Sequence, residues 1–347
     1  MIKNLNLKNF TVFKELDIEF SPKINIIIGE NGTGKTHLLK AAYLLCGGST
    51  NPTDEQEIAL TTQILRLFMP LDDKLGKLHH QGAKETAQLN AHFKNDAFVI
   101  LNFHNNSKYV VSQEEKNYRQ NTQVPVFIPT KEVLSFMKGF NSLYEKYGLS
   151  FDLTYQDICL LLDLPEVRPE NLHEKSKWAM EKIETVCGGK FVFSGGGKVT
   201  FQTDNAEYSA NAMAEGFRKA GMLSRLLQTG AIKPGVSGPL FWDEPESNLN
   251  PKLMKRLVEI LLELSRNGQQ IILATHDYVL LKWFDLLMDK GKEDHVRFHT
   301  LYRDLDSKEI KLASTDEYLN IDPNPIDDAF GYLINQEIEN DMEGLGK

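Results

Sequence analysis

Eight residues near the N-terminus have the types and the spacing of a phosphate-binding loop. They match the pattern G-x-x-x-x-G-K-[ST] at every fixed position, and they are Gly29, Glu30, Asn31, Gly32, Thr33, Gly34, Lys35 and Thr36. In such a loop the lysine reaches the β- and γ-phosphates of a nucleotide, and the hydroxyl binds Mg²⁺. We therefore expect ATP and Mg²⁺ here, with Lys35 in catalysis and Thr36 as a metal ligand.

The elements on either side of the loop favour this interpretation over a chance match in a glycine-rich turn. Residues 24–28 form an apolar run typical of a buried strand, and residues 36–45 have the pattern of a helix. A strand, a turn and a helix in this order bring several N–H groups and the positive end of the helix dipole to one point. A polyphosphate binds well at such a point.

Two acids and a histidine follow apolar runs further along the chain. Asp243 and Glu244 come directly after residues 240–242, and His276 comes shortly after residues 271–274. The carboxyl ends of parallel strands meet at one sheet edge, where α/β folds bind ligands. We expect Asp243 to hold Mg²⁺ and Glu244 to orient the water that attacks the γ-phosphate, with His276 at the same edge. The alternatives are a solvated strand end and an ordinary loop histidine.

At these residues the chain resembles the ABC-type ATPases, in particular their RecF/SMC/OLD-like branch. The resemblance lies in four stretches: KNLNLKNFTVFKELDIEF, GENGTGKT, LFWDEPESNLNP and IILATH. It implies an α/β fold of the P-loop NTPase class, an ABC-type head with a mixed core sheet, an antiparallel β subdomain and an inserted helical lobe. Lys35 and Thr36 would be Walker A residues, Asp243 and Glu244 the Walker B pair, 247–250 the D-loop and His276 the switch histidine. After His276 we expect no TOPRIM nuclease domain.

The family also implies that two heads enclose two ATP molecules, each site being completed by the signature helix of the other subunit. The usual Leu-Ser-Gly-Gly-Gln signature is absent, and residues 212–219 stand in its place. Within them, Glu215 and Gly216 are candidates for contacting the partner's nucleotide, and an ordinary helix start is the alternative. No glutamine marks the Q-loop, for which 129–132 is the positional candidate. Phe13 either stacks on adenine or packs on its own hairpin.

The remaining pattern divides the chain into three parts. Residues 1–128 would carry Walker A and the β subdomain, residues 129–220 the helical lobe with a hairpin and the signature, and residues 221–347 the rest of the head. Smaller elements are also predicted from periodicity: strands at 97–103, 108–112 and 124–128, helices at 57–67 and 209–227, a hairpin at 191–201, a helix with Asn250 as its N-cap and Pro251 as its first residue, and a helix capped by Asn324. Residues 71–95 read as a loop, in which His79 and His80 are solvated residues or, alternatively, metal ligands.

Composition and charge limit the possible binding partners and the cellular compartment of the protein. The net charge of −9 argues against a generally basic surface for nucleic acid. The three cysteines are far apart and suggest neither a disulfide framework nor a zinc site, as in the reducing cytoplasm. No signal peptide and no apolar run of about 20 residues is present. We therefore expect a cytoplasmic protein without a membrane span.

Three functional hypotheses follow. In the first, ATP closes a homodimer, hydrolysis reopens it, and the change controls an effector or nuclease on a separate chain in a bacterial defence system. In the second, the dimer is a DNA repair or recombination clamp, with these candidate DNA contacts: Lys131, Lys138, Arg218 and Lys219. In the third, the protein is a non-hydrolysing ATP-binding scaffold, against which Glu244 speaks. We expect the apolar face of the last helix to pack on the protein's own core, and a docking face is the alternative.

Overall fold

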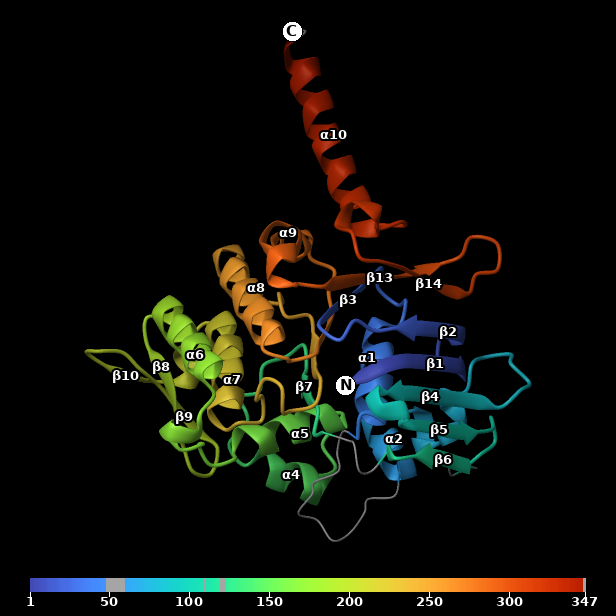
Figure 1. The fold of residues 1–347 in the computed structure, drawn as a ribbon, viewed down its shortest axis with the longest axis horizontal. Coiled ribbons are helices and arrows are strands. Elements are labelled where there is room, and N and C mark those ends of the chain that lie inside the picture. Colours follow the sequence, from blue (N-terminus) through green and yellow to red (C-terminus); the bar gives the residue numbers. More distant parts are fainter. Residues whose placement is uncertain (48–59, 109, 111, 119–122, 346–347) are drawn as a thin grey trace.

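The fold is built around a mixed sheet that contains the strands leading to the predicted site. The computed structural model describes residues 1–47, 60–108, 110, 112–118 and 123–345. Six strands form the central sheet (Figure 1), in the order β14 (Ile310–Thr315), β13 (Val296–Arg303), β3 (Ile24–Gly29), β12 (Ile271–Ala274), β11 (Leu240–Asp243) and β7 (Val126–Ile128). The pairs from β13 to β7 are parallel, and β14 is antiparallel. Strands β13 and β14 lie in a stretch for which the sequence pattern predicted no element.

The central sheet is buried on both faces at its middle strands, since every residue of β3, β12, β11 and β7 is buried. In β3, Ile26 and Ile28 belong to one core cluster, whereas Ile27 belongs to the other. In β11, Trp242 and Phe241 are divided in the same way. This alternation follows from the two-residue period of a strand. It places a continuous core on each side of the strands that end at the site.

Nine helices are described, and two of them carry site residues at their N-termini. Helix α1 (Lys35–Leu45) packs on one face of the central sheet, and α2 (Leu60–Phe68) packs against α1 in the same core cluster. Residues 57–59 of the helix predicted at 57–67 lie outside the described residues. The other helices are α4 (Phe140–Tyr147), α5 (Leu153–Leu162), α6 (Glu174–Cys187), α7 (Glu215–Gln228), α8 (Pro251–Arg266), α9 (Tyr278–Leu287) and α10 (Pro325–Leu345). Helix α7 begins six residues later than predicted, since residues 210–212 form a 3-10 turn.

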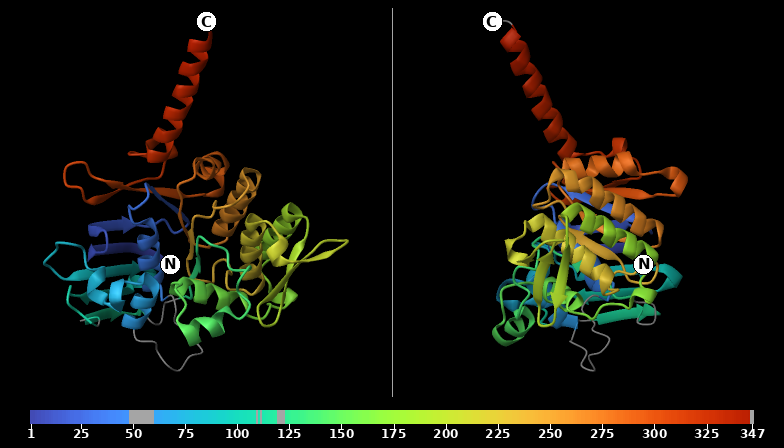
Figure 2. Two further views of the ribbon diagram at one scale, coloured as in Figure 1. Left: turned by 180° about the vertical axis from the view of Figure 1, so that it is seen from behind. Right: turned by 90° about the vertical axis from the view of Figure 1, so that its left-hand side faces the viewer.

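An antiparallel sheet packs against α1 on the side away from the helical lobe (Figure 2). Its strands are β2 (Phe13–Glu19), β1 (Ile2–Phe10), β4 (Ala87–Phe93), β5 (Phe98–Phe103) and β6 (Ser112–Lys116), in that order. The prediction of a loop over 71–95 is therefore wrong for β4, which pairs with both β1 and β5. Two of its three inward positions are alanines, so its apolar alternation is weak in the sequence. Of the strand expected at 108–112, residues 109 and 111 lie outside the described residues, and residue 112 begins β6.

The lobe between β7 and β11 contains α4 to α7 and a three-stranded antiparallel sheet. The predicted hairpin is present as β8 (Lys190–Ser194) and β9 (Lys198–Gln202), to which β10 (Glu207–Ser209) pairs. Helix α5 contacts both β7 and α7, which ties the lobe to the central sheet. The three-part division of the chain stays a prediction.

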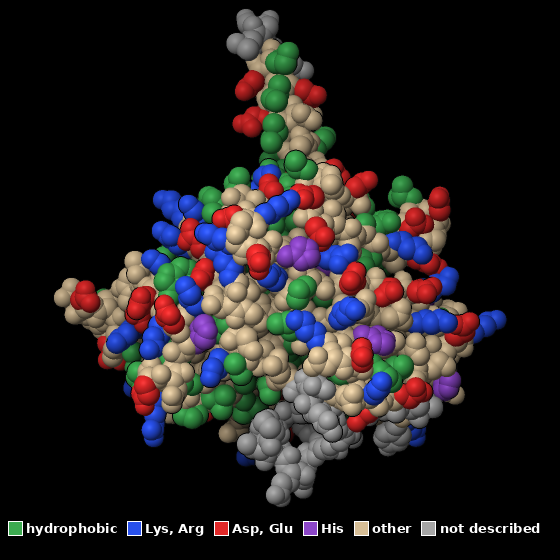
Figure 3. Space-filling view, viewed as in Figure 1, with side chains coloured by type: hydrophobic (Ala, Val, Ile, Leu, Met, Phe, Trp, Pro, Cys, Tyr) green, Lys and Arg blue, Asp and Glu red, His purple; other side chains and the backbone are tan. Residues whose placement is uncertain are grey.

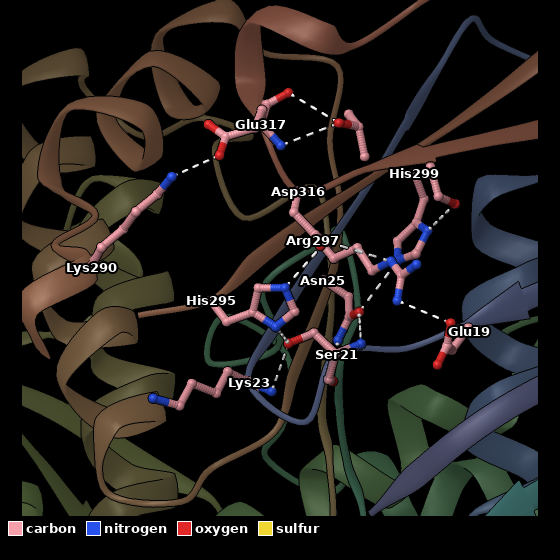
Figure 4. Close-up of polar contacts among 12 residues, drawn as sticks. Glu19, Ser21, Lys23, Asn25, Lys290, His295, Arg297, His299, Asp316 and Glu317 are labelled. Atoms are coloured by element: carbon pink, nitrogen blue, oxygen red, sulfur yellow. Dashed lines mark hydrogen bonds and ion pairs between the residues drawn. The ribbon is translucent and has the colours of Figure 1, made fainter. Parts of the chain in front are cut away.

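A polar network joins β3 to the start of β13 (Figure 4). Ser21 Oγ lies 2.9 Å from His295 Nδ1, and His295 Nε2 lies 3.1 Å from Asp316 Oδ1. These residue types occur in hydrolase triads. Here, however, Ser21 is buried and its hydroxyl oxygen already accepts a bond from the Lys23 N–H. The network therefore holds strands together.

Helix α10 projects from the body of the molecule (Figures 1 and 2). Asn324 precedes it, and Pro325 is its first residue as predicted. Its apolar face does not pack on the core, because Leu333, Ile334 and Ile338 are half or more exposed. The expectation that this face is buried is wrong. No helix in the described part of the chain is long and apolar enough to cross a lipid bilayer.

Candidate functional site

The phosphate loop lies between the end of β3 and the start of α1. Gly34 precedes the helix with a φ of 94°, a left-handed conformation that favours glycine. Lys35 Nζ donates to the carbonyl oxygens of Gly29 (2.7 Å) and Glu30 (3.1 Å). The ammonium group thus lies across the loop. Burial lowers the pKa of Lys35, and the nearby carboxylate of Glu244 opposes that shift. The exposed loop residues are Glu30, Asn31 and Gly32.

The ring of Phe13 packs against the phosphate loop at Gly34. A Cβ atom built at Gly34 would lie 2.7 Å from Phe13 Cζ and 2.6 Å from Val12 Cγ2. The glycine is therefore required by this packing as well as by its φ angle. Phe13 has no exposed surface and belongs to the core around α1. Its ring cannot stack on an adenine in this structure, so the cofactor-binding prediction for Phe13 is wrong and its packing alternative holds.

The end of β11 meets the start of α1. Thr36 Oγ1 donates a 2.8 Å hydrogen bond to Asp243 Oδ2 across 207 positions of sequence. Asp243 is 5% exposed, and this burial raises the pKa of its carboxyl group, while the Thr36 bond opposes the rise. A hydroxyl and a carboxylate at hydrogen-bond distance beside a phosphate loop are the hard oxygen donors that Mg²⁺ prefers. These two residues therefore fit the predicted metal site.

Glu244 and His276 face each other at the same sheet edge. His276 Nδ1 lies 3.5 Å from Glu244 Oε1 and 3.8 Å from Glu246 Oε1. Glu246, which the sequence argument passed over, accepts bonds from the Thr275 hydroxyl (2.8 Å) and the His276 N–H (3.2 Å). It thereby fixes the segment that carries the histidine. Both Glu244 and His276 keep exposed surface, so a nucleotide and water can reach them.

Glu244 has an uncommon backbone conformation, and its carbonyl oxygen accepts bonds from a buried lysine and from the Ser247 N–H. Its φ is 50°, in the left-handed region that non-glycine residues seldom adopt. Lys219 Nζ, from α7, donates to the Glu244 carbonyl oxygen at 3.1 Å. Lys219 is only 1% exposed, and burial lowers the pKa of its amine. In the sequence, only its position four residues after Glu215 marks Lys219, and that spacing does not distinguish a buried lysine from a lysine on the surface.

The signature region contacts the D-loop of its own chain. A Cβ atom at Gly216 would lie 2.8 Å from the Asn248 carbonyl oxygen, so the small residue lets α7 approach this turn. Glu215 begins α7 and is partly exposed, whereas Gly216 is buried. These contacts explain the glycine within one chain. The contact of Glu215 and Gly216 with a partner's nucleotide stays a prediction.

The positional Q-loop candidate reaches the site through Thr130. This residue follows β7, and its hydroxyl bonds to Asp243, which lowers the pKa of that carboxyl group. Glu132 is buried, and its Oε1 lies 2.8 Å from Arg218 Nε of α7. The segment therefore joins the magnesium candidate Asp243 to the signature helix. Two DNA-contact candidates, Arg218 and Lys219, are used inside the fold.

His79 and His80 lie outside this site. His79 Nε2 lies 2.6 Å from the Glu85 carbonyl oxygen, and His80 Nδ1 lies 3.0 Å from the Thr11 carbonyl oxygen. At least one ring nitrogen of each histidine is thus at hydrogen-bond distance from a backbone oxygen. In the described part of the chain, no group of three or more His, Cys, Asp or Glu side chains is arranged to hold a metal ion.

Comparison with known proteins decides the family. A family model described as "AAA domain" matches residues 4–184, which is more than half of the chain. The chain belongs to this family, in its ABC-type, RecF- and SMC-like group. A second model, described as "AAA domain, putative AbiEii toxin, Type IV TA system", matches residues 145–282. The AAA-domain assignment thus covers both the phosphate loop and the Walker B segment.

Relatives of this AAA-domain protein include two curated proteins named DNA replication and repair protein RecF. The one from Phocaeicola vulgatus is 45% identical over 60 residues, 17% of this chain and 16% of the relative. The one from Bacillus thuringiensis is 24% identical over 177 residues, 51% of this chain and 40% of the relative. The chain therefore matches less than half the length of either.

Solved SMC heads share the fold. An SMC head bound to the C-winged helix domain of ScpA matches with a TM-score of 0.57 at 14% identity, covering 91% of this chain and 97% of that one. The SMC head domain from Thermotoga maritima matches with a TM-score of 0.52 at 14% identity, covering 90% and 98%. These matches confirm the predicted fold class, an α/β ABC-type head.

Proposed function

We propose that this AAA-domain protein binds and hydrolyses ATP at the edge formed by β3, β11 and β12, and that ATP joins two copies into a dimer that controls a separate effector. The observation that carries the proposal is the 2.8 Å bond between Thr36 and Asp243. It brings the phosphate loop and the acidic strand end together, and His276 lies on the other side of Glu244. A polyphosphate and its metal need all these groups in one place.

Each residue has a distinct task in the proposed reaction. The loop N–H groups and Lys35 would bind the phosphates, and Lys35 would exchange its two carbonyl partners for phosphate oxygens. Thr36 and Asp243 would hold Mg²⁺, which neutralises phosphate charge when bound. Glu244 would orient the attacking water and accept its proton, and His276 would donate to the γ-phosphate. The Glu244 carboxylate lies at this edge, 3.5 Å from His276 Nδ1.

Dimerisation and a bacterial defence role are the finer parts of the proposal. Glu215 and Gly216 would complete the ATP site of the other copy. The match to a model whose description names a toxin system supports control of an effector or nuclease on a separate chain. The SMC head bound to a ScpA domain supports a protein partner. A cytoplasmic location suits these relatives.

A Glu244→Gln variant tests the site and the dimer together. Removing a general base typically costs 10²- to 10⁴-fold in rate. We expect ATP turnover to fall by that much, ATP binding to persist, and a dimer to appear with ATP on size exclusion. Lys35→Ala should abolish nucleotide binding. A Glu244→Gln protein that stays monomeric with bound ATP would exclude the gated dimer, and turnover in both variants would exclude this site.

The same preparation separates the two remaining hypotheses. A non-hydrolysing scaffold would show no turnover in the wild-type chain. A DNA clamp would bind duplex DNA with an affinity that falls steeply with salt. Two of the four candidate DNA contacts are engaged within the fold, because Arg218 is paired with Glu132 and Lys219 is buried.

A further inference from the structure

Helix α10 is attached to the body only through its first turns. Ile326 is buried, and Tyr318 donates a 2.6 Å hydrogen bond to Asp327 Oδ1. The ring of Phe330 stacks on Tyr278 with 4.2 Å between centroids. Tyr278 begins α9, two residues after His276. The base of α10 is therefore anchored beside the switch histidine segment, and the rest of the helix points away from the body (Figures 1 and 3).

The free part of α10 carries an apolar stripe. Figure 3 shows hydrophobic side chains along its length. At about 100° per residue, side chains four positions apart lie on one side of a helix. This side is 38–68% exposed and consists of Phe330, Leu333, Ile334, Ile338 and Met342. Such a contiguous apolar stripe is typical of a surface that binds another protein.

Charge identifies the kind of partner. The helix sequence from Pro325 to Leu345 contains six acidic residues and no lysine or arginine. Glu337 and Asp341 follow Phe330 by seven and eleven residues, so they point within about 20° of the same direction. Two carboxylates therefore lie inside the apolar stripe. A surface that covers the stripe must offer cations opposite them, because a buried unpaired charge is costly.

We propose that α10 is a docking helix for a separate protein whose apolar groove carries lysine or arginine opposite Glu337 and Asp341. This rests on the proposed function, since that protein would be the controlled effector. A second copy of the chain fits poorly: pairing two α10 stripes brings Glu337 and Asp341 of both copies into one apolar seam. An anionic lipid surface fits poorly for the same reason.

The test begins with a photo-crosslinking amino acid placed at Leu333 in the full 347-residue chain, expressed in its native host. The matched control places it at Tyr332, which is also exposed but lies about 100° away around the helix. We expect one protein to be captured from position 333 and not from 332. That protein is then purified, and its dissociation constant for the full chain is measured.

Charge reversal decides whether the captured protein is the proposed partner. We expect Glu337→Lys with Asp341→Lys to weaken binding at least tenfold, and a Lys→Glu change in the partner groove to restore it. Glu339→Lys, on the opposite side, should change binding less than twofold. ATP turnover should stay at the wild-type rate in all these α10 variants, so a failure of docking is distinguishable from a failure of the ATP site.

Four results would overturn the proposal. The first is capture of a second copy of this chain, with self-association in the ultracentrifuge that Leu333→Ser removes. The second is co-sedimentation of the chain with phosphatidylglycerol vesicles through α10. The third is equal capture from positions 332 and 333, or none from 333, and the fourth is an affinity that the double charge reversal changes less than twofold.

Discussion

Replacing Lys219 by methionine should slow ATP turnover while leaving ATP binding intact. The amine of Lys219 donates the 3.1 Å bond to the Glu244 carbonyl oxygen. Methionine keeps the apolar stem and removes the donor. A hydrogen bond from a charged donor is worth about 1.5–3 kcal/mol, and the left-handed backbone that it helps to hold costs about 1–2 kcal/mol. Once the bond is lost, Glu244 keeps its backbone bonds to Ala274 and Ser247 but loses the contact that ties it to α7.

The size of the effect follows from these energies. Each 1.36 kcal/mol in the barrier changes the rate about tenfold. If most of the bond energy serves to orient Glu244, kcat should fall about 10- to 100-fold. The KM for ATP should change less than about twofold, because Lys35 and the loop N–H groups are untouched. Removing a buried charge offsets the loss of one hydrogen bond, so the melting temperature should change little.

Steady-state ATP hydrolysis, nucleotide binding and thermal unfolding measure these quantities. Lys182→Met is the matched control. Lys182 and Lys219 both line an apolar cavity between α6, α7 and α8, but the Lys182 side chain is exposed. It should leave kcat unchanged. A folded Lys219→Met protein with wild-type kcat would refute the argument, because the backbone bonds of Glu244 to Ala274 and Ser247 would then suffice to position it.

Three further predictions concern the supports of the site. Phe13→Ala should lower the free energy of unfolding in urea by about 3–5 kcal/mol; a raised KM for ATP without that loss would instead indicate contact with adenine. Gly34→Ala should weaken ATP binding in calorimetry at least tenfold, since its φ is 94° and its Cβ would meet Phe13; unchanged affinity would contradict this. Burial lowers the pKa of His299 to about 3. As the pH falls below 6.5, this histidine therefore binds a proton in the unfolded chain before it does so in the folded chain, and the free energy of unfolding decreases. His299→Gln should remove about 2–3 kcal/mol of that loss between pH 6.5 and 4.5, and identical pH profiles in both proteins would exclude the histidine.

The sequence alone determined the phosphate loop, the Walker B strand end and the capped helix that follows it. These features depend on residues close together in the chain: the glycines before Lys35, the apolar run before Asp243, and Asn250 with Pro251. Asn250 Oδ1 accepts from the Lys252 N–H, as its position predicts. Backbone requirements of this kind depend on a few consecutive residues, so the sequence predicts them without knowledge of the tertiary structure.

Where a strand, side chain or helix depends on a partner that is distant in the sequence, only the tertiary structure showed what it contacts. Strand β4 is weakly apolar by itself, and it becomes a strand because β1 and β5 pair with it on both sides. Phe13 and Lys219 carry no local sign of burial, since the loop and the turn that cover them come from other segments. Helix α10 has the same apolar periodicity as a buried helix, and whether a core lies beside it is set by where the chain leaves β14. Periodicity reports which side of an element is apolar, whereas the three-dimensional path of the chain determines what that side meets.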